Sequence, residues 1–446
     1  MDSSSLTRVK SSRDTLAKIT PICNKIGVTR VSDVTFMDRL SIPNYSAILP
    51  GTEDTIWVYS GKGISPADAK AGALMESIER YSSLPSNYQG TFIQGRYSQL
   101  LESYSNVLHP AEVVEAVNYE NKDVIMDFLQ GFDLMTREQI LVPAEIALYR
   151  YSPKPPAVRV FSQFHTNGLA SGNVIEEAIC HALCEVIERD SVSIADLCSS
   201  SIAYSILERI TDSLRCATNN GILFDENKFV DDSSIFPEID ISGFMKKFVP
   251  IGRIARKFDA AHIPLMVKDI TQKDIGIPTF VASSIEWITH DFGYFARGYG
   301  THPDARIALI RAITESSQTR AVNIQGARDD LKKIRYEEVD EIYKRKWQFM
   351  PSAIGETNEQ NIFKFSEIET YVNDDILDDI HFMLDRLKRA GLKRAIIVNL
   401  TNPNVGIPVV RAIVPGLETF EVTQSIMGRR AKNFFWEKYL GFGKID

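Results

Sequence analysis

A ten-residue segment occurs twice in this chain, and the repetition limits what the chain can fold into. Residues 73–82 are A-L-M-E-S-I-E-R-Y-S, and residues 182–191 are A-L-C-E-V-I-E-R-D-S. Both follow the pattern A-L-x-E-x-I-E-R-x-S, whose apolar spacing predicts two similar helices. Residues three apart lie on one helical face, so each copy presents two glutamates side by side, and an arginine follows the second.

Two such helices could together bind a metal ion and a nucleotide. Carboxylates bind divalent cations such as Mg²⁺, which bridge to phosphate oxygens. Arginine binds phosphate through paired hydrogen bonds. One E-x-x-E-R segment alone is more typical of a solvated helix face. Because the two copies share the same apolar frame, we expect their four carboxylates to lie at one site: Glu76, Glu79, Glu185 and Glu188.

The composition excludes several classes of protein. With 446 residues and 44% hydrophobic content, the chain can form a large core and two or more lobes. A net charge of -8 argues against nucleic-acid binding. No apolar run reaches about 18 residues, which argues against a membrane span, and the first residues lack the apolar core of a signal peptide. Five scattered cysteines without a CxxC pair fit a reducing cytoplasm: Cys23, Cys180, Cys184, Cys198 and Cys216.

Cys180 and Cys184 are one helical turn apart and resemble half of a zinc site. The chain has no second thiolate pair, and the only imidazoles nearby in the sequence are His165 and His181. We therefore interpret both cysteines as small buried core residues.

The second copy lies on a long helix predicted for residues 174–197, with Asn173 as its N-cap. At about 100° per residue, Asn173, Glu177, Glu185 and Glu188 share one polar stripe, which also includes His181. The flanking residues are too apolar for an exposed helix, and buried carboxylates need cations. His181 either lines this site or bonds a neighbour.

The first copy lies on a helix predicted for residues 66–82, after a strand at 55–60. Gly61-Lys62-Gly63 is interpreted as a turn that binds phosphate through backbone N–H groups and Lys62. It is not a P-loop, because the G-x-x-x-x-G-K-[ST] spacing is absent. On a third helix, predicted for residues 303–324, Arg311, Glu315 and Gln318 fall within about 60° of each other. An Arg311–Glu315 pair on a surface helix is the alternative interpretation.

Strands and helices alternate without a regular βαβ rhythm, which predicts an α+β fold rather than a doubly wound sheet. Residues 1–50 are expected to form an irregular arm with one helix near 12–25, and residues 200–250 a polar insert or lobe. The other expected helices are 110–118 and 376–390. The other expected strands are 91–95, 129–134, 140–149, 158–164, 263–267, 279–286, 394–399 and 409–413.

Four segments together resemble the YcaO family of ATP-dependent enzymes that modify peptide backbones. They are 61–82 (G-K-G-I-S-P-A-D-A-K-A-G-A-L-M-E-S-I-E-R-Y-S), 166–190 (T-N-G-L-A-S-G-N-V-I-E-E-A-I-C-H-A-L-C-E-V-I-E-R-D), 311–320 (R-A-I-T-E-S-S-Q-T-R) and 409–418 (V-V-R-A-I-V-P-G-L-E). They occur in the order of the family. The resemblance implies a YcaO domain at 55–435, after an N-terminal arm at 1–54 and before a C-terminal tail at 436–446.

The resemblance implies an ATP-binding fold that is neither P-loop nor Rossmann, with mixed and antiparallel sheets flanked by helices. It implies Mg²⁺ bound by Glu76, Glu79, Glu185 and Glu188. Lys62, Arg189 and Arg311 would contact phosphates. Asn173 and Glu177 match positions that line the nucleotide pocket, and Glu315 and Gln318 would join them. It identifies no catalytic base.

The chemistry implied by the resemblance is phosphorylation of a backbone amide oxygen, followed by attack of a nucleophile. Azoline-forming cyclodehydratases use a Cys, Ser or Thr side chain of a precursor peptide, and they typically end in a proline-rich tail. This sequence has no proline after Pro415. It is closer to the group that uses sulfide, often with a TfuA-type partner, to make thioamides such as the thioglycine of methyl-coenzyme M reductase.

The sequence therefore predicts a cytoplasmic thioamide-forming enzyme that acts on a protein or peptide. A homodimer is compatible with the sequence. The alternatives are an azoline cyclodehydratase and a non-catalytic nucleotide-binding scaffold. The aromatic-rich residues 425–446 are expected to pack as a structural element without a catalytic base.

Overall fold

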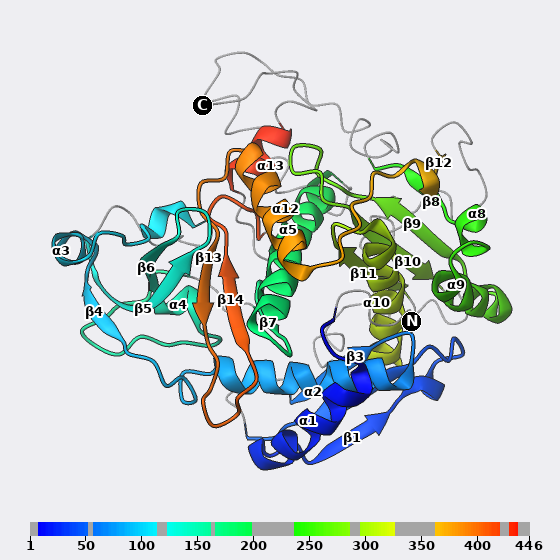
Figure 1. The fold of residues 1–446 in the computed structure, drawn as a ribbon, viewed down its shortest axis with the longest axis horizontal. Helices are drawn as coiled ribbons and strands as arrows, with labels where there is room; N and C mark the ends of the chain where they lie inside the picture. The colour runs from blue at the N-terminus through cyan, green and yellow to red at the C-terminus, as the bar shows by residue number, and fades with distance from the viewer. Residues whose placement is uncertain are drawn as a thin grey trace, which may run out of the picture.

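Three β-sheets and the helices between them make up the fold, which is α+β as the sequence predicted (Figure 1). The computed structural model describes residues 8–51, 57–113, 123–161, 166–198, 236–285, 295–325, 362–419 and 428–435. Among the strands in these ranges, only β8 and β12 pair in parallel. The sheets therefore differ from the parallel sheets of Rossmann and P-loop folds.

The N-terminal residues form a helix and two strands of a small three-stranded sheet. Helix α1 (Ser12–Ile26) matches the predicted helix, and its N-cap is Ser11. Strand β2 (Asn44–Ile48) pairs in antiparallel order with β1 (Arg30–Asp33) on one side and with β3 (Val58–Lys62) on the other. The interpretation of residues 1–50 as irregular outside that helix was wrong, because β3 supplies a ladder of backbone hydrogen bonds that a sequence pattern does not show.

A six-stranded antiparallel sheet lies on the left of Figure 1. Its strand order is β4-β5-β13-β14-β7, and β6 also pairs with β5. Small elements at its ends are α3 (Tyr97–Ser103), α4 (Ala144–Ala147) and a 3₁₀ turn at Pro110–Glu112. The strands are β4 (Ile93–Arg96), β5 (Ile125–Asp133), β6 (Glu138–Pro143), β7 (Leu169–Ser171), β13 (Ile396–Asn399) and β14 (Val409–Ile413).

A five-stranded sheet lies on the right of Figure 1, with the order β11-β10-β9-β8-β12. Helices α8 (Ser242–Met245) and α9 (Val249–Ala261) accompany it. Of the polar insert expected at 200–250, residues 200–235 lie outside the described ranges. The strands are β8 (Glu238–Asp240), β9 (Leu265–Asp269), β10 (Thr279–Ile285), β11 (Phe295–Thr301) and β12 (Ile362–Lys364).

Three long helices, each beginning shortly after a strand, hold the candidate site residues. Helix α2 (Pro66–Ser83) follows β3, and a capping box between Ser65 and Asp68 fixes its start. Helix α5 (Ile175–Cys198) follows β7, and α10 (Ala305–Gln325) follows β11. Helix α5 contacts β7 and β14 of one sheet and β11 of the other, so it joins the two halves of the molecule (Figure 1).

The prediction that Gly61-Lys62-Gly63 forms a turn is wrong, because Gly61 and Lys62 lie inside β3. Strand β3 packs directly on the backbone of α2. A Cβ atom at Gly61 would lie 2.0 Å from the Ala69 carbonyl oxygen and 2.2 Å from the Ala73 nitrogen. Glycine is therefore required at position 61 for close packing of strand and helix, rather than for a phosphate turn.

Two other local predictions failed. In the predicted strand at 158–164, the described residues up to Phe161 are not extended into a strand, because the N–H groups of Val160 and Phe161 donate to the Glu145 carboxylate. In the predicted helix at 110–118, the described part is only the 3₁₀ turn. The segment 140–149 is strand only as far as Pro143, where α4 begins.

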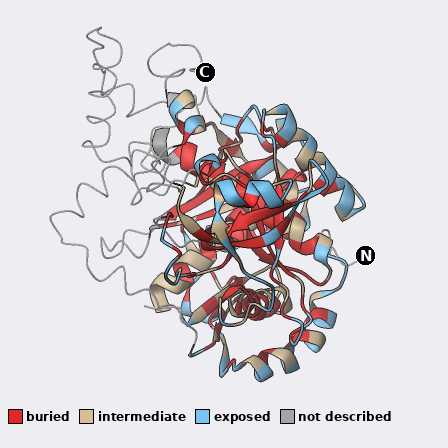
Figure 2. Ribbon diagram, turned by 90° about the vertical axis from the view of Figure 1, so that its left-hand side faces the viewer, coloured by how far each residue is buried: buried red, intermediate tan, exposed pale blue. Residues whose placement is uncertain are grey.

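Three buried apolar clusters form the core, and Figure 2 shows them inside the sheets and beneath the helices. Two further helices, α12 (Ile376–Arg389) and α13 (Arg429–Phe435), both contact α5. Short 3₁₀ turns lie at Thr35–Met37 and Phe365–Glu367. No helix in the described part of the chain has the length and apolarity to cross a membrane.

Candidate nucleotide and metal site

The glutamates of the two repeat copies lie close together, where α2 approaches α5. Glu79 is buried, and its Oε2 lies 3.5 Å from the Ser171 hydroxyl of β7. Burial raises the pKa of Glu79 well above its ordinary value, and the nearby carboxylates of Glu185 and Glu76 raise it further. The two helices therefore bring carboxylates from both copies within range of strong mutual repulsion.

A fifth carboxylate extends this cluster from α10. Burial, followed by the charges of Glu315 and Glu185, raises the pKa of Glu188 from 4.5 to about 8. The pKa of Glu185 is raised by burial and by Glu315. We call Glu76, Glu79, Glu185, Glu188 and Glu315 the acidic cluster. The structure brings all four predicted glutamates into it, with Glu315 beside them.

Arg80 is enclosed by the acidic cluster. Its guanidinium lies 3.1 Å from a Glu76 oxygen and 3.7 Å from a Glu79 oxygen, and it stacks 5.6 Å above the Tyr149 ring. The side chain is 15% exposed. The charges of Glu76, Glu79 and Glu185 raise the pKa of Arg80. Arg80 therefore neutralises part of the cluster from within the protein.

The donor set of the acidic cluster fits Mg²⁺. Hard oxygen ligands from several elements converge, and burial together with mutual repulsion raises the pKa of Glu79, Glu185 and Glu188. Buried carboxylates in excess of their counter-charges are stabilised by divalent cations.

Basic side chains also gather at this site, around His181 of α5. Burial lowers the pKa of His181 well below its ordinary value, and the charges of Arg311, Arg8 and Lys62 lower it further. His181 is therefore neutral and lies among three cations. A region that holds both carboxylates and cations can bind both the metals and the phosphates of a nucleotide.

The predicted phosphate ligands make protein contacts in this structure. Lys62 Nζ pairs with the Glu315 carboxylate, although the sequence predicted that Lys62 would contact phosphate rather than a protein carboxylate. Arg311 Nη1 donates to the Thr301 carbonyl at 2.9 Å. Arg189 is half-buried, and its charge lowers the pKa of both Glu185 and Glu188.

Ser60 of β3 connects α2 to α10 at this site. Its N–H donates to Glu76 Oε2 at 3.0 Å, and its carbonyl accepts from Gln318 Nε2 at 2.7 Å. The predicted grouping of Gln318 with Glu315 therefore corresponds to one helix face that meets β3 beside the acidic cluster.

Asn173 and Glu177 lie together at the start of α5, where Asn173 Nδ2 donates to Glu177 Oε2 at 3.1 Å. Two N-terminal residues that the sequence did not single out reach them. Thr15 Oγ1 donates to Asn173 Oδ1 at 3.1 Å, and Arg8 Nη1 lies 3.2 Å from Glu177 Oε1. Their partners are more than 150 positions away, so no local pattern could have identified Arg8 or Thr15.

Arg411 of β14 is another residue that the sequence analysis missed. It is 2% exposed, and its charge lowers the pKa of Glu185. A charged residue within a strand of otherwise apolar residues (V-V-R-A-I) was the available signal.

Cys180 and Cys184 are buried core residues, as the sequence predicted. The structure adds an imidazole that the sequence did not associate with them, because His302 lies within 4.8 Å of both sulfur atoms. The Asp304 N–H donates to His302 Nδ1 at 2.9 Å. Burial lowers the pKa of His302 well below its ordinary value, so the ring is neutral and carries its proton on Nε2, which lies 3.7 Å from Asp379 Oδ2.

Asp190, the variable residue after Arg189 in the second copy, anchors the C-terminal helix α13. Arg430 donates to both Asp190 oxygens at 2.9 Å, and its Nη1 donates to Asp274 at 2.6 Å. Phe434 stacks on Phe236. The described part of the aromatic-rich end thus packs on the core, and the predicted tail at 436–446 lies outside the described ranges.

Comparison with known proteins identifies relatives along most of the chain. A family model described as "YcaO cyclodehydratase, ATP- and Mg²⁺-binding" matches residues 60–222 and 230–418. An uncharacterised protein of Methanothermobacter thermautotrophicus is 32% identical over 415 residues, which cover 92% of this chain and 94% of the relative. A protein of Rhizobium leguminosarum bv. trifolii, named for its place in the tfuA 3′ region, is 27% identical over 96% of this chain and 92% of its own.

Two solved structures share the fold. YcaO from Methanopyrus kandleri, bound with AMPPCP and Mg²⁺, has a TM-score of 0.66 at 21% identity, covering 94% of this chain and 95% of that one. A heterocyclase in complex with substrate and cofactor has a TM-score of 0.70 at 20% identity. That likeness covers 95% of this chain but only 54% of the heterocyclase chain.

Proposed function

Because this chain belongs to the YcaO family, which binds ATP and Mg²⁺, we propose that it uses ATP to activate a peptide backbone amide for attack by sulfide. The product is a thioamide, such as the thioglycine of methyl-coenzyme M reductase. The observation that carries the ATP-dependent part of this proposal is the acidic cluster, whose five carboxylates meet from three helices beside three basic side chains.

We assign the predicted residues to roles on this basis. Glu76, Glu79, Glu185 and Glu188 hold Mg²⁺. Asn173 and Glu177 line the nucleotide pocket with Arg8 and Thr15, which contact them directly. Glu315 and Gln318 support the metal-binding side, since Glu315 adjoins Glu188. The residues that contact phosphate are Lys62, Arg189 and Arg311.

The chemistry requires that an amide oxygen become a leaving group. Bound Mg·ATP supplies the phosphoryl group that the amide oxygen accepts, and that oxygen departs as phosphate when sulfide adds to the carbon. Arg189 and Lys62 stabilise the negative charge that shifts between phosphate oxygens. Arg80, already paired with Glu76, holds the α2 carboxylates in place.

Sulfide is the proposed nucleophile because the Rhizobium relative is named for a tfuA neighbourhood and aligns over 96% of this chain. A TfuA-like partner that supplies sulfide belongs to the same proposal, as does a homodimeric assembly. We place the activity in the cytoplasm, where the free thiols of Cys23, Cys180 and Cys184 are stable.

Azoline formation is the second candidate function, favoured by the heterocyclase that shares the fold. Its nucleophile would be a Cys, Ser or Thr side chain of the peptide itself. A non-catalytic scaffold is the weaker alternative, because a scaffold does not need a cluster of carboxylates whose ionisation is suppressed.

Intact-mass analysis separates these functions. A pool of tryptic peptides is incubated with the protein, ATP, Mg²⁺ and sulfide. Thioamidation replaces oxygen with sulfur and adds about 16 Da, whereas cyclodehydration removes water, a loss of about 18 Da. We expect ATP-dependent gains that disappear with Glu185→Gln and remain with Glu176→Gln, a matched variant on the same helix outside the acidic cluster.

Losses without sulfide-dependent gains would establish the cyclodehydratase instead. Unchanged peptides, together with no binding of Mg·AMPPCP by calorimetry, would favour neither enzyme and would refute ATP-dependent activation.

A further inference from the structure

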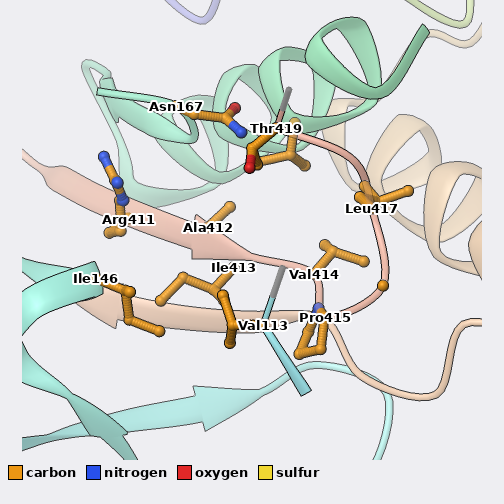
Figure 3. A pocket seen from close by; sticks show the side chains of 12 residues that line it. Val113, Ile146, Asn167, Arg411, Ala412, Ile413, Val414, Pro415, Leu417 and Thr419 are labelled. Carbon is orange, nitrogen blue, oxygen red and sulfur yellow. The ribbon is translucent and has the colours of Figure 1, made fainter. Parts of the chain in front are cut away.

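The pocket in Figure 3 lies between β14 and α5, and its wall is mostly apolar. Its volume admits only about one or two water molecules, so it does not hold a segment of another protein. A protein partner must therefore bind the outer surface of the molecule.

The surface formed by α8 and α9 is strongly basic, although the chain as a whole carries a net charge of -8. Residues 246–257 contain no carboxylate and five cations, which are Lys246, Lys247, Arg253, Arg256 and Lys257. The first four are exposed, and Lys257 is half-buried. Both helices lie at the right-hand edge of the molecule in Figure 1, where α9 contacts α10. We call these five residues, together with Val249, the basic face.

The residues of the basic face that belong to α9 lie on one side of the helix. At about 100° per residue, Val249, Arg253, Arg256 and Lys257 fall within an arc of about 100°. Asp259, a carboxylate of the same helix, lies about 60° beyond the edge of this arc. The opposite side of the helix is buried: Pro250, Ile251, Gly252, Ile254, Ala255 and Phe258. The helix is thus held by its apolar side and presents a stripe of positive charge to solvent.

The exposed cations of the basic face have no counter-charge. Among the described residues, Lys246, Lys247, Arg253 and Arg256 make no ion pair. Lys257 donates to the Ser41 carbonyl, and its pKa is lowered by burial and by the charge of Arg253. Like charges gathered in this way repel one another in the isolated protein. A bound acidic ligand would remove that repulsion.

Apolar groups lie among these cations. Val249 is 59% exposed, and the half-buried Phe248 ring has the Arg306 guanidinium 5.7 Å from its centre. Interfaces between proteins combine an apolar centre with a polar rim and are enriched in arginine and aromatic residues. Nucleic-acid sites instead bind phosphate along a mainly charged surface, and the acidic chain as a whole does not favour them. The composition of the basic face therefore favours a protein ligand.

We propose that the basic face binds an acidic segment of a partner protein. Carboxylates of the segment pair with Arg253 and Arg256 through parallel hydrogen bonds, and Lys246 and Lys247 extend the positive surface along α8. Val249 contacts an apolar side chain of the segment. This inference is independent of the proposed function, because α9 contains none of the residues assigned to ATP or Mg²⁺.

Fluorescence anisotropy with a labelled acidic peptide tests the proposal. The probe is fluorescein-(Glu-Glu-Leu)₄, titrated with the full chain at low and at high salt. We expect the wild type to bind it and the affinity to fall with salt. The double variant Arg253→Glu/Arg256→Glu should weaken binding about tenfold or more, because attraction becomes repulsion. The control, Lys388→Glu/Arg389→Glu, makes the same charge change at exposed positions of α12 and leaves the affinity unchanged.

A second variant separates charge from packing. Val249→Ser keeps every cation and should weaken peptide binding about threefold, because apolar contact area is lost. If the double arginine variant is unstable in thermal unfolding, Lys246→Glu/Lys247→Glu, outside the buried side of α9, decides in its place.

Several outcomes would overturn the proposal. They are no binding of the peptide by the wild type, and equal losses of affinity in the α9 and α12 double variants. Tighter binding of a labelled single-stranded RNA than of the peptide at the same salt, lost in the α9 variant, would make the face a nucleic-acid site instead. Calorimetry with Mg·AMPPCP is expected to give the same affinity in the wild type and in Arg253→Glu/Arg256→Glu, so failure of peptide docking leaves the proposed function standing.

Discussion

The two repeat copies have the same residues at seven positions but different surroundings. In the first, on α2, Arg80 is enclosed by Glu76 and Glu79 and stacks on Tyr149. In the second, on α5, Arg189 is half-buried and its charge lowers the pKa of Glu185 and Glu188, while Glu188 adjoins Glu315 of α10. The glutamates of both copies join the acidic cluster, whereas the two arginines have different surroundings.

The variable position after the arginine differs in the same way. It is Tyr81 in the first copy, which packs against the apolar core, and Asp190 in the second, which is held by Arg430. The repeated residues thus build the shared acidic cluster, and the residue at the variable position joins each helix to its own neighbours. Identical sequence here identifies the carboxylates that come together at one site but does not identify the function of every residue in the repeat.

The largest expected effect distinguishes the two arginines directly. Arg80→Ala leaves buried carboxylates without their counter-charge, so we expect the free energy of unfolding to fall by about 3–5 kcal/mol. Arg189→Ala is expected to change it by less than about 1 kcal/mol. ATP turnover by Arg189→Ala should instead fall by about 10²–10³-fold, as for other groups that stabilise developing charge. Urea unfolding and phosphate release measure the two quantities.

Equal losses of stability in the two variants would show that both arginines are structural. Stable Arg80→Ala protein with impaired turnover would reverse the assignment. Exposed Arg429, next to the buried ion pair of Arg430, supplies the control: Arg429→Ala should alter neither measurement.

The second expected effect concerns pH and Mg²⁺. Glu188 has a pKa of about 8 in the folded protein, raised from 4.5. Its contribution to the stability of the metal-free protein is therefore fully present below pH 4.5 and is lost as the pH rises through about 8. Mg²⁺ must displace this proton, so its affinity should rise by up to about tenfold, or 1.4 kcal/mol, per pH unit below 8.

Thermal unfolding with and without Mg²⁺ between pH 6 and 9 measures this linkage. We expect the stabilisation by Mg²⁺ to grow with pH in the wild type and to grow less steeply in Glu188→Gln, where only Glu79 and Glu185 keep raised pKa values. The same pH dependence in both proteins would mean that Glu188 does not exchange its proton for metal.

Local patterns predicted much of the site because its glutamates lie on helices whose periodicity is strong. The predicted helix at 66–82 is observed at Pro66–Ser83, and the strand at 409–413 is observed as predicted. Strand β11 was missed because its sequence, F-A-R-G-Y-G-T, contains two glycines, which weaken a strand pattern. The packing of α10 on β11 compensates for this weakness.

The rest of the site depends on contacts that sequence spacing does not encode. Arg8 meets Glu177 across 169 positions of the sequence, and Arg430 meets Asp190 across 240. The glycine pattern around Lys62 was misinterpreted for the related reason that glycine serves close packing as well as turns. Which of these uses applies is decided by the tertiary partner.

The smallest expected effect refines the comparison by preserving charge. Arg189→Lys keeps the positive charge but replaces a planar fork with a single ammonium group. If Arg189 binds phosphate through two parallel hydrogen bonds, we expect turnover to fall about tenfold, less than in the alanine variant, because only the second bond and its geometry are lost. Arg80→Lys should keep nearly wild-type turnover, since near Glu76 and Glu79 its charge matters more than its shape. Steady-state kinetics at saturating ATP measures both. Wild-type turnover in Arg189→Lys would show that Arg189 acts as a simple charge, as Arg80 does, and the functional difference between the two copies would then lie in Tyr81 and Asp190 alone.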